Sequence, residues 1–100
     1  MTCSISRADD DIYVVENIEA SVTAKTPTDA RILATTAARK DAFLVLLARL
    51  NLDLAIADNL GVSEIADMVK SEQINNEKIA GNNYSAMFNI SFAKNFVDHI

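Results

Sequence analysis

The stretch from Thr26 to Leu50 constrains the fold of this chain more than any other, because it has the alanine-rich composition and the boundary residues of one long helix. Thr26 can accept a hydrogen bond from a free amide of the first turn, and Pro27 suits the first helical position. Asp29 completes a T-x-x-D pattern that resembles a capping box. The sequence therefore predicts a helix that begins at or very near Thr26.

The spacing of small and apolar residues predicts which side of this helix is buried. At about 100° per residue, one face collects alanines together with larger aliphatic side chains. This predicted face consists of Ala30, Ala34, Ala37, Ala38, Leu44, Val45 and Ala48, flanked by Leu33 and Leu47. Because small side chains let a helix lie close to a sheet, we expect a sheet to cover it. The opposite side becomes apolar near the end of the helix, so the residues after Asn51 are expected to cover that end.

The segment from Ile12 to Ala24 has the period-two alternation and the β-branched residues of a strand. Its predicted buried face consists of Ile12, Val14, Ile18, Ala20, Val22 and Ala24. Glu16 and Asn17 interrupt the alternation, and such an interruption is typical of a β-bulge. We therefore predict one long strand with a bulge or bend at these two residues.

The residues after the long helix predict short helical segments. Residues 51–61 fit either a helical turn or an extended loop, and Gly61 is placed to end a short helix there. Ser63 is then predicted to be the N-cap of a second short helix, E-I-A-D-M-V-K. Its predicted buried residues are Ile65, Met68 and Val69.

The last third of the chain predicts a β-hairpin. Gly81, Asn82 and Asn83 tolerate the positive φ of a tight turn, and they separate Gln73–Ala80 from Tyr84–Phe92. The inward residues of the second strand are predicted to be Tyr84, Ala86, Phe88, Ile90 and Phe92. In the first strand Ile74 and Ile79 are an odd number of residues apart, which puts them on opposite faces. A bulge near Asn75 and Asn76 is predicted to return both isoleucines to the core.

Together these segments predict an α+β fold. It is a two-layer sandwich in the order β-α-(α)-β-β, with a three-stranded antiparallel sheet packed on one long helix and the first strand paired with the last. The length of 100 residues suits one domain. We expect residues 12–100 to form that domain and residues 1–11 to be a mobile acidic lead.

Charge and hydropathy narrow the classes of partner. The formal net charge is −5, and the nine basic residues form no run, which argues against nucleic acid or an anionic membrane as the main partner. A single cysteine, Cys3, excludes an intramolecular disulfide. No apolar stretch is long enough to span a bilayer and the first residues lack the apolar core of a secretory signal, so the chain as given is expected to be soluble.

Few residues are candidates for chemistry. His99 is the only histidine, and without a histidine or cysteine near it neither a zinc site nor a Cys-His nucleophile is expected. Gly61 and Gly81 are the only glycines, so there is no glycine-rich phosphate loop. Asp9–Asp11 lack the ligand spacing of an EF-hand. No metal or cofactor is therefore predicted.

Three carboxylates remain as candidate catalytic residues. An enzymatic function is the least favoured of the three hypotheses. Asp41 falls on the predicted alanine face of the helix, where it is either a buried functional carboxylate or a residue at the margin of the sheet. Glu72 and Glu77 lie on the predicted hairpin, either as a pair for acid–base catalysis or as cross-strand and solvated side chains. The chain is expected to be no enzyme.

One predicted surface is unusual for a solvated face. The sheet face turned away from the helix carries small and nearly uncharged side chains, which are Ser21, Thr23, Ser85, Met87, Asn89 and Ser91. Low charge density reduces the desolvation cost of contact, so this face is either a protein interface or a plain polar surface. We expect a protein-interaction module that docks a partner or a second copy through this face or an edge strand. The alternative is a small-ligand carrier with a pocket between Phe43–Leu50 and Leu52–Val69.

Several motifs resemble those of an uncharacterised proteobacterial family of envelope proteins. They are Ala30-Arg31 followed by Ala34, Ala38 and Ala42, then V-K-S-E-Q-I-N-N-E-K-I, and then Y-S-A-M-F-N-I-S-F after a glycine turn. In that family an A-R-x-x-A helix follows a strand, and a V-x-S-x-x-I-x-x-E strand leads into Y-x-A-x-x-x-V-x-F. The resemblance covers residues 12–100. It implies a periplasmic or cell-envelope setting and an accessory role, with no catalytic residue or cofactor.

Overall fold

The computed structural model describes residues 13–94 of the chain. The predictions for the acidic lead, for Ile12, for Cys3, for Asp9–Asp11 and for His99 fall outside the described residues.

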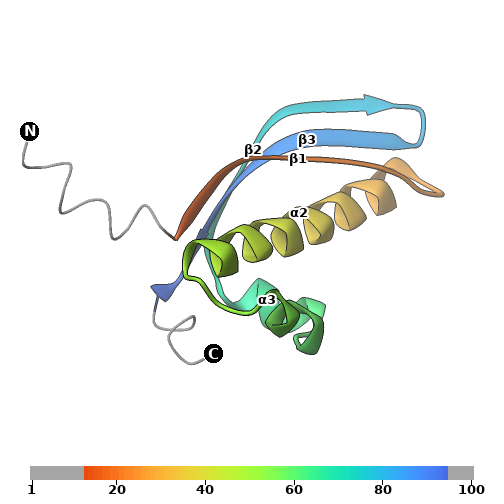
Figure 1. The fold of residues 1–100 in the computed structure, drawn as a ribbon. Coiled ribbons are helices and arrows are strands. Elements are labelled where there is room, and N and C mark those ends of the chain that lie inside the picture. The colour runs from red at the N-terminus through yellow and green to blue at the C-terminus, as the bar shows by residue number, and fades with distance from the viewer. Residues whose placement is uncertain (1–12, 95–100) are drawn as a thin grey trace, which may run out of the picture.

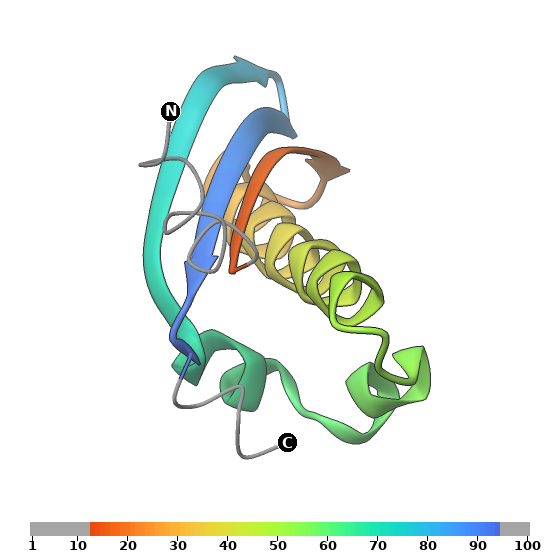
Figure 2. The same ribbon diagram turned by 60° about the vertical axis from the view of Figure 1, so that its left-hand side comes forward.

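The described residues form a two-layer α+β fold. The elements are β1 (Val14–Thr23), α2 (Pro27–Arg49), the 3₁₀ helix η1 (Leu54–Asn59), α3 (Val62–Asp67), β2 (Val69–Ala80) and β3 (Asn83–Phe92). The strands form one antiparallel sheet in the order β1-β3-β2. The helix α2 lies across one face of this sheet, and η1 and α3 lie beside the middle and C-terminal part of α2 (Figures 1 and 2). The predicted fold class and the pairing of the first strand with the last are confirmed.

The ends of α2 follow from local hydrogen bonds. The Thr26 hydroxyl oxygen accepts a hydrogen bond from the Asp29 amide at 3.1 Å, as the capping pattern predicted. At the other end Asn51 adopts a left-handed φ of 57°. The Leu52 amide then donates to the Leu47 carbonyl at 2.9 Å, which is the bond of a Schellman motif.

The buried side of α2 winds around the helix axis. Its fully buried residues are Ala30, Ala34, Ala38, Ala42, Phe43, Leu46 and Leu47. The alanines recur every fourth residue, and a step of four residues turns by about 40°. Because the sheet is twisted, its line of contact crosses the helix obliquely and follows this row. The prediction was therefore wrong for Ala37, Val45 and Ala48, which are exposed.

The two predicted bulges are present, and each is centred on an asparagine. In β1 the register shifts between Val15 and Ile18, and Asn17 has a φ of 60°. Val15 is therefore the buried residue at the start of the strand, whereas Val14 pairs with Ser91 on the outer face, contrary to prediction.

In β2 the register shifts between Asn75 and Lys78, and Asn76 has a φ of 53°. This bulge puts Ile74 and Ile79 on the same, helix-facing side, as predicted. Ile79 is nevertheless 60% exposed, because β2 is an edge strand and α2 packs mainly against β1 and β3.

The hairpin turn and the central strand β3 match the sequence pattern. Gly81 has a φ of 61°, which glycine adopts without steric cost. The inward residues of β3 are all buried, and they are Tyr84, Ala86, Phe88, Ile90 and Phe92. Phe92 packs against Phe43 of α2 with 5.9 Å between ring centroids, which joins the sheet to the helix.

The start of α3 differs from the prediction. Gly61 is the N-cap, and its amide donates to the Glu64 carboxylate at 2.9 Å, so the helix begins before Ser63. Gly61 does not end η1 in a left-handed conformation, since its φ is −77°. The helix is also shorter than predicted, because Val69 already pairs with Phe92 as the first residue of β2.

Candidate interaction surface on the open sheet face

The six residues that the sequence assigned to the outward sheet face all lie on it. We call the set Ser21, Thr23, Asn83, Ser85, Met87, Asn89 and Ser91 the open face. In the register of the sheet, Ser21 pairs with Ser85 and Thr23 pairs with Asn83. The helices lie on the opposite face, so no described element covers the open face (Figures 1 and 2).

Hydrogen bonds between neighbouring strands hold the polar side chains of the open face in place. The Asn83 side-chain amide donates to the Thr23 hydroxyl at 2.9 Å and to the Ser21 hydroxyl at 3.3 Å. The Asn89 side-chain amide donates to the Gln73 carbonyl oxygen at 3.4 Å. The sequence had assigned Asn83 to the turn, and its role was missed because it depends on the strand register.

The Asn89 side chain also supports the bulge in β1. Its carbonyl oxygen accepts a hydrogen bond from the Asn17 backbone amide at 2.9 Å, which satisfies a donor that the bulge leaves without a ladder partner. The same asparagine therefore links the open face to both outer strands.

The charge on and around the open face is low. Among the register partners of its β3 residues, only Glu19 and Lys78 are charged. These two side chains line a shallow depression of about 310 Å³ together with Ser85 and Met87. The depression is open and has no aromatic lining, so it offers a contact surface and no enclosed site.

The edges of the sheet are less suited to pairing with another strand. The β1 and β2 edges each contain a bulge, at Asn17 and Asn76, which interrupts a continuous row of backbone donors and acceptors. The Arg49 guanidinium of α2 also donates to the Val14 carbonyl at 2.7 Å. Bulged edges of this kind resist edge-to-edge association.

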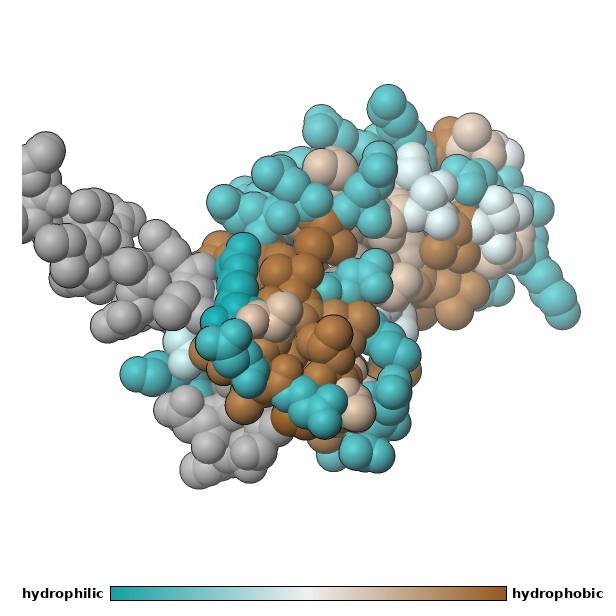
Figure 3. Space-filling model, viewed as in Figure 1, coloured by the Kyte–Doolittle hydropathy of each residue, from teal (hydrophilic) through white to brown (hydrophobic). Residues whose placement is uncertain are grey.

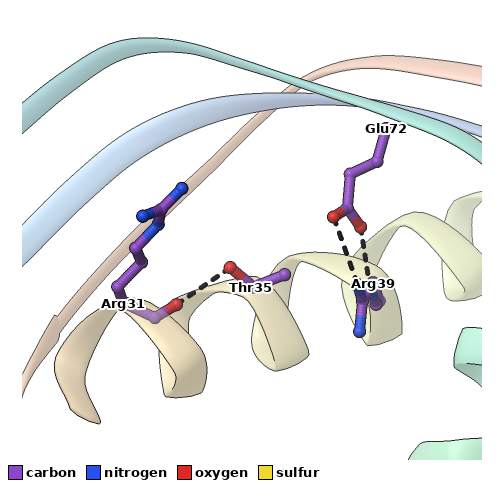
Figure 4. A network of polar contacts seen from close by, with 4 residues as sticks. All are labelled: Arg31, Thr35, Arg39 and Glu72. Carbon is purple, nitrogen blue, oxygen red and sulfur yellow. Dashed lines mark hydrogen bonds and ion pairs between the residues drawn. The ribbon is translucent and has the colours of Figure 1, made fainter. Parts of the chain in front are cut away.

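Two of the three carboxylates considered for catalysis, Glu72 and Glu77, are paired with arginines of α2. The Arg39 guanidinium donates two hydrogen bonds to the Glu72 carboxylate, of 2.7 and 3.2 Å, which Figure 4 draws as dashed lines. Glu77 lies 3.6 Å from the Arg31 guanidinium and accepts a hydrogen bond from the Tyr84 hydroxyl. Both carboxylates therefore fasten the edge strand β2 to the helix.

Asp41 lies apart from these pairs. It is exposed, and it follows Arg39 by two residues, which places it about 200° further around the helix. The prediction of a place on the buried face or at the sheet margin was wrong, because the line of contact has wound away from that side. The structure does not bring Asp41 together with Glu72 or Glu77.

Burial and the hydrogen bond to Glu77 raise the pKa of Tyr84 to about 12. Its side chain is fully buried on the face of the sheet that α2 covers. The tyrosine therefore acts as a neutral donor in the core.

An apolar cavity lies on the helical side. The sequence placed a pocket beside Phe43–Leu50, but Phe43, Leu46 and Leu47 there are fully buried. The cavity has a volume of about 210 Å³ and lies nearer the N-terminus of α2, between Leu33 and Ala37 of that helix and Val62 of α3. Figure 3 shows apolar residues gathered over the helices on this side.

Within residues 13–94, no group of three or more His, Cys, Asp or Glu side chains is placed to hold a metal ion. None of the helices there combines the length and the hydropathy that crossing a bilayer requires.

Comparisons of the chain with models of protein families, with curated proteins and with solved structures gave no match. A function for this chain therefore has to be inferred from its sequence and from the geometry of residues 13–94.

Proposed function

We propose that this chain is a non-enzymatic protein-interaction module that docks a protein partner, or a second copy of itself, through the open face. The observation that carries the proposal is a sheet face with small, uncharged side chains that no element of residues 13–94 covers. Protein surfaces that are only solvated normally carry many charged side chains, whereas the centres of interfaces are depleted of them.

The arrangement of the side chains supports binding at low cost. Short side chains such as serine lose less rotamer freedom on contact than lysine or glutamate. Asn83 and Asn89 are already held by cross-strand hydrogen bonds, so part of that ordering precedes binding. Few charges would have to be desolvated.

The sheet face is the proposed docking surface in preference to an edge strand. Strand addition needs an uninterrupted row of backbone groups, and the bulges at Asn17 and Asn76 break both rows. The open face has no comparable interruption along β3.

The size of the open face indicates a reversible complex. Even the whole outer face of the sheet, three strands wide and about ten residues long, measures only roughly 14 Å by 33 Å, or about 460 Å². A stable interface buries about 800 Å² on each partner. A permanent dimer through this face alone is therefore not expected.

The resemblance to proteobacterial envelope proteins supports a periplasmic or cell-envelope setting for this module. The motifs that carry the resemblance are the A-R-x-x-A start of α2 and the hairpin of β2 and β3. They are mostly core positions, so they concern the fold more than the docking surface.

Site-specific photo-cross-linking in the cells that produce the protein tests the proposal. A photoreactive residue in place of Met87 is expected to give a discrete covalent adduct, and the same residue in place of the exposed Ala48 is not. The substitution Ser85→Lys should abolish the adduct, because it puts a charge into the contact. No adduct from Met87, or equal adducts from both positions, would contradict docking through the open face.

Sedimentation velocity separates the two kinds of partner. Docking of a second copy predicts a sedimentation coefficient that rises with concentration and that Ser85→Lys returns to the monomer value. If the protein is a monomer at all concentrations, docking of a second copy is excluded and docking of a different protein remains.

A further inference from the structure

The cavity between α2 and α3 is a groove with apolar walls, and we call it the groove. Leu33, Ala37, Leu60, Val62 and Ile65 line it. Ile65 is buried at its base, whereas Leu33 and Val62 are 51% and 60% exposed at its rim. A groove with these walls favours contact with an apolar group over exposure to water.

The charged residues of this groove are both cations. Arg39 and Lys40 line it, and no carboxylate does. The charge of Arg39 is compensated by its bidentate ion pair with the Glu72 carboxylate. Lys40 is exposed and makes no ion pair within residues 13–94. An apolar groove next to a cation that no lining carboxylate compensates is complementary to an amphipathic anion.

The dimensions decide between a docked helix and a smaller ligand. The six residues of α3 provide a wall of about 9 Å, which is shorter than two turns of a helix. The volume of about 210 Å³ is also below the 300–1,000 Å³ of pockets for drug-sized ligands. Thr36 is the only uncharged polar residue of the lining, so a ligand in the groove would make few hydrogen bonds with it.

We propose that this groove binds a small unbranched alkyl carboxylate. The alkyl chain lies against Leu33, Ala37 and Val62, and the carboxylate lies against the Lys40 ammonium. This site is on the helical side of the molecule, so it does not depend on docking through the open face.

Titration of the full chain with hexanoate, octanoate, 1-octanol and octylammonium, followed by amide NMR shifts, tests the proposal. The shifts are expected at residues that line the groove, with octanoate bound more tightly than octanol and octylammonium bound most weakly. Each methylene that enters the groove should tighten binding by up to about fourfold. Shifts centred elsewhere, no saturable shift with octanoate, or octylammonium bound as tightly as octanoate would overturn the proposal.

Two pairs of variants locate the contacts. Lys40→Gln should weaken octanoate binding about two- to fivefold and leave octanol binding unchanged, whereas Lys70→Gln, at an exposed lysine outside the groove, should change neither. Ala37→Leu should fill the groove and abolish binding, whereas Ala48→Leu, on the same helix outside it, should not. Equal effects within either pair would count against this site.

Two controls separate this inference from other readings. Ser85→Lys should leave octanoate binding intact, so a failure of the proposed docking face and a failure of this site are distinguishable. An acidic amphipathic peptide that displaces octanoate from the groove and binds more tightly would instead assign the groove to a protein partner and overturn the small-ligand assignment.

Discussion

Within residues 13–94, three asparagines hold the backbone in the left-handed region, and each lies where an element bends or ends. Asn17 and Asn76 form the bulges of the edge strands, and Asn51 follows the end of α2. Asparagine tolerates this conformation better than other residues with a side chain, apart from aspartate, because its short polar group can bond locally. Asn17 and Asn76 therefore set the shape of the sheet edges, and Asn51 ends the helix.

The bulge at Asn76 gives a prediction for stability. Asn76→Val should lower the free energy of unfolding by about 1–2 kcal/mol, because a β-branched residue is strained at positive φ. Asn76→Gly should be nearly neutral. Asn75→Val, at a neighbouring exposed position without positive φ, is the matched control. Urea denaturation measures all three, and equal losses for Asn76→Val and Asn75→Val would contradict the account.

Tyr84 gives a prediction for the dependence of stability on pH. Its pKa is raised from 10.0 to about 12, so between these values the folded chain holds a proton that the unfolded chain has lost. Stability from this group is present below pH 10 and is lost as the pH rises towards 12. The loss in that window should be smaller in Tyr84→Phe, which has no hydroxyl to titrate. Denaturation at several alkaline pH values measures it, and identical slopes for both proteins would contradict the raised pKa.

At the scale of the elements, α2 approaches the sheet closely because its line of contact consists of alanines. Ala30, Ala34, Ala38 and Ala42 are fully buried, and their methyl groups leave room for the large side chains of β3. Towards the end of α2, where α3 and η1 also cover the core, the buried residues are the larger Phe43, Leu46 and Leu47.

Two neighbouring alanines test this packing. Ala38→Leu should lower the free energy of unfolding by about 1–3 kcal/mol, because the extra methylenes have no space against the sheet. Ala37→Leu, one residue earlier and exposed, should change it by less than about 0.5 kcal/mol. Thermal or urea denaturation compares the two variants. A similar effect of both would mean that the buried line does not follow every fourth residue.

The two arginine pairs attach the edge strand β2 to α2. The Arg39–Glu72 pair is bidentate and partly buried, whereas the Arg31–Glu77 pair is longer and more exposed. A double-mutant cycle with Arg39→Gln and Glu72→Gln should give a coupling energy of about 1 kcal/mol, and the corresponding cycle at Arg31 and Glu77 a value near zero. A larger coupling at the exposed pair would reverse this ranking.

At the scale of the whole molecule, the fold has two different surfaces. The open face of the sheet is mostly polar and carries few charges, and the helical side carries an apolar groove with a cation. Strands β1 and β3 carry the open face, whereas helices α2 and α3 provide most of the groove lining. A change on one is therefore expected to leave the other intact.

The predictable part of this architecture is the part that local sequence determines. The alternation in β1 and β3 located the six predicted residues of the open face, the alternation in β3 located its own core residues, and Thr26 located the start of α2. The buried line of α2 depends on the twist of the sheet, so the exposure of Val45 and Ala48 could not be read from helical spacing. The cross-strand bonds of Asn83 depend on the strand register in the same way.

Cysteine labelling in cells tests most directly whether the open face is a docking surface. In a Cys3→Ser background, Ser21→Cys places a thiol on the open face and Ala48→Cys places one on the exposed side of α2. Both purified variants should react freely with a maleimide. In the cells that produce the protein, the account predicts that Ser21→Cys is protected and Ala48→Cys is not, whereas equal labelling at both positions would contradict it.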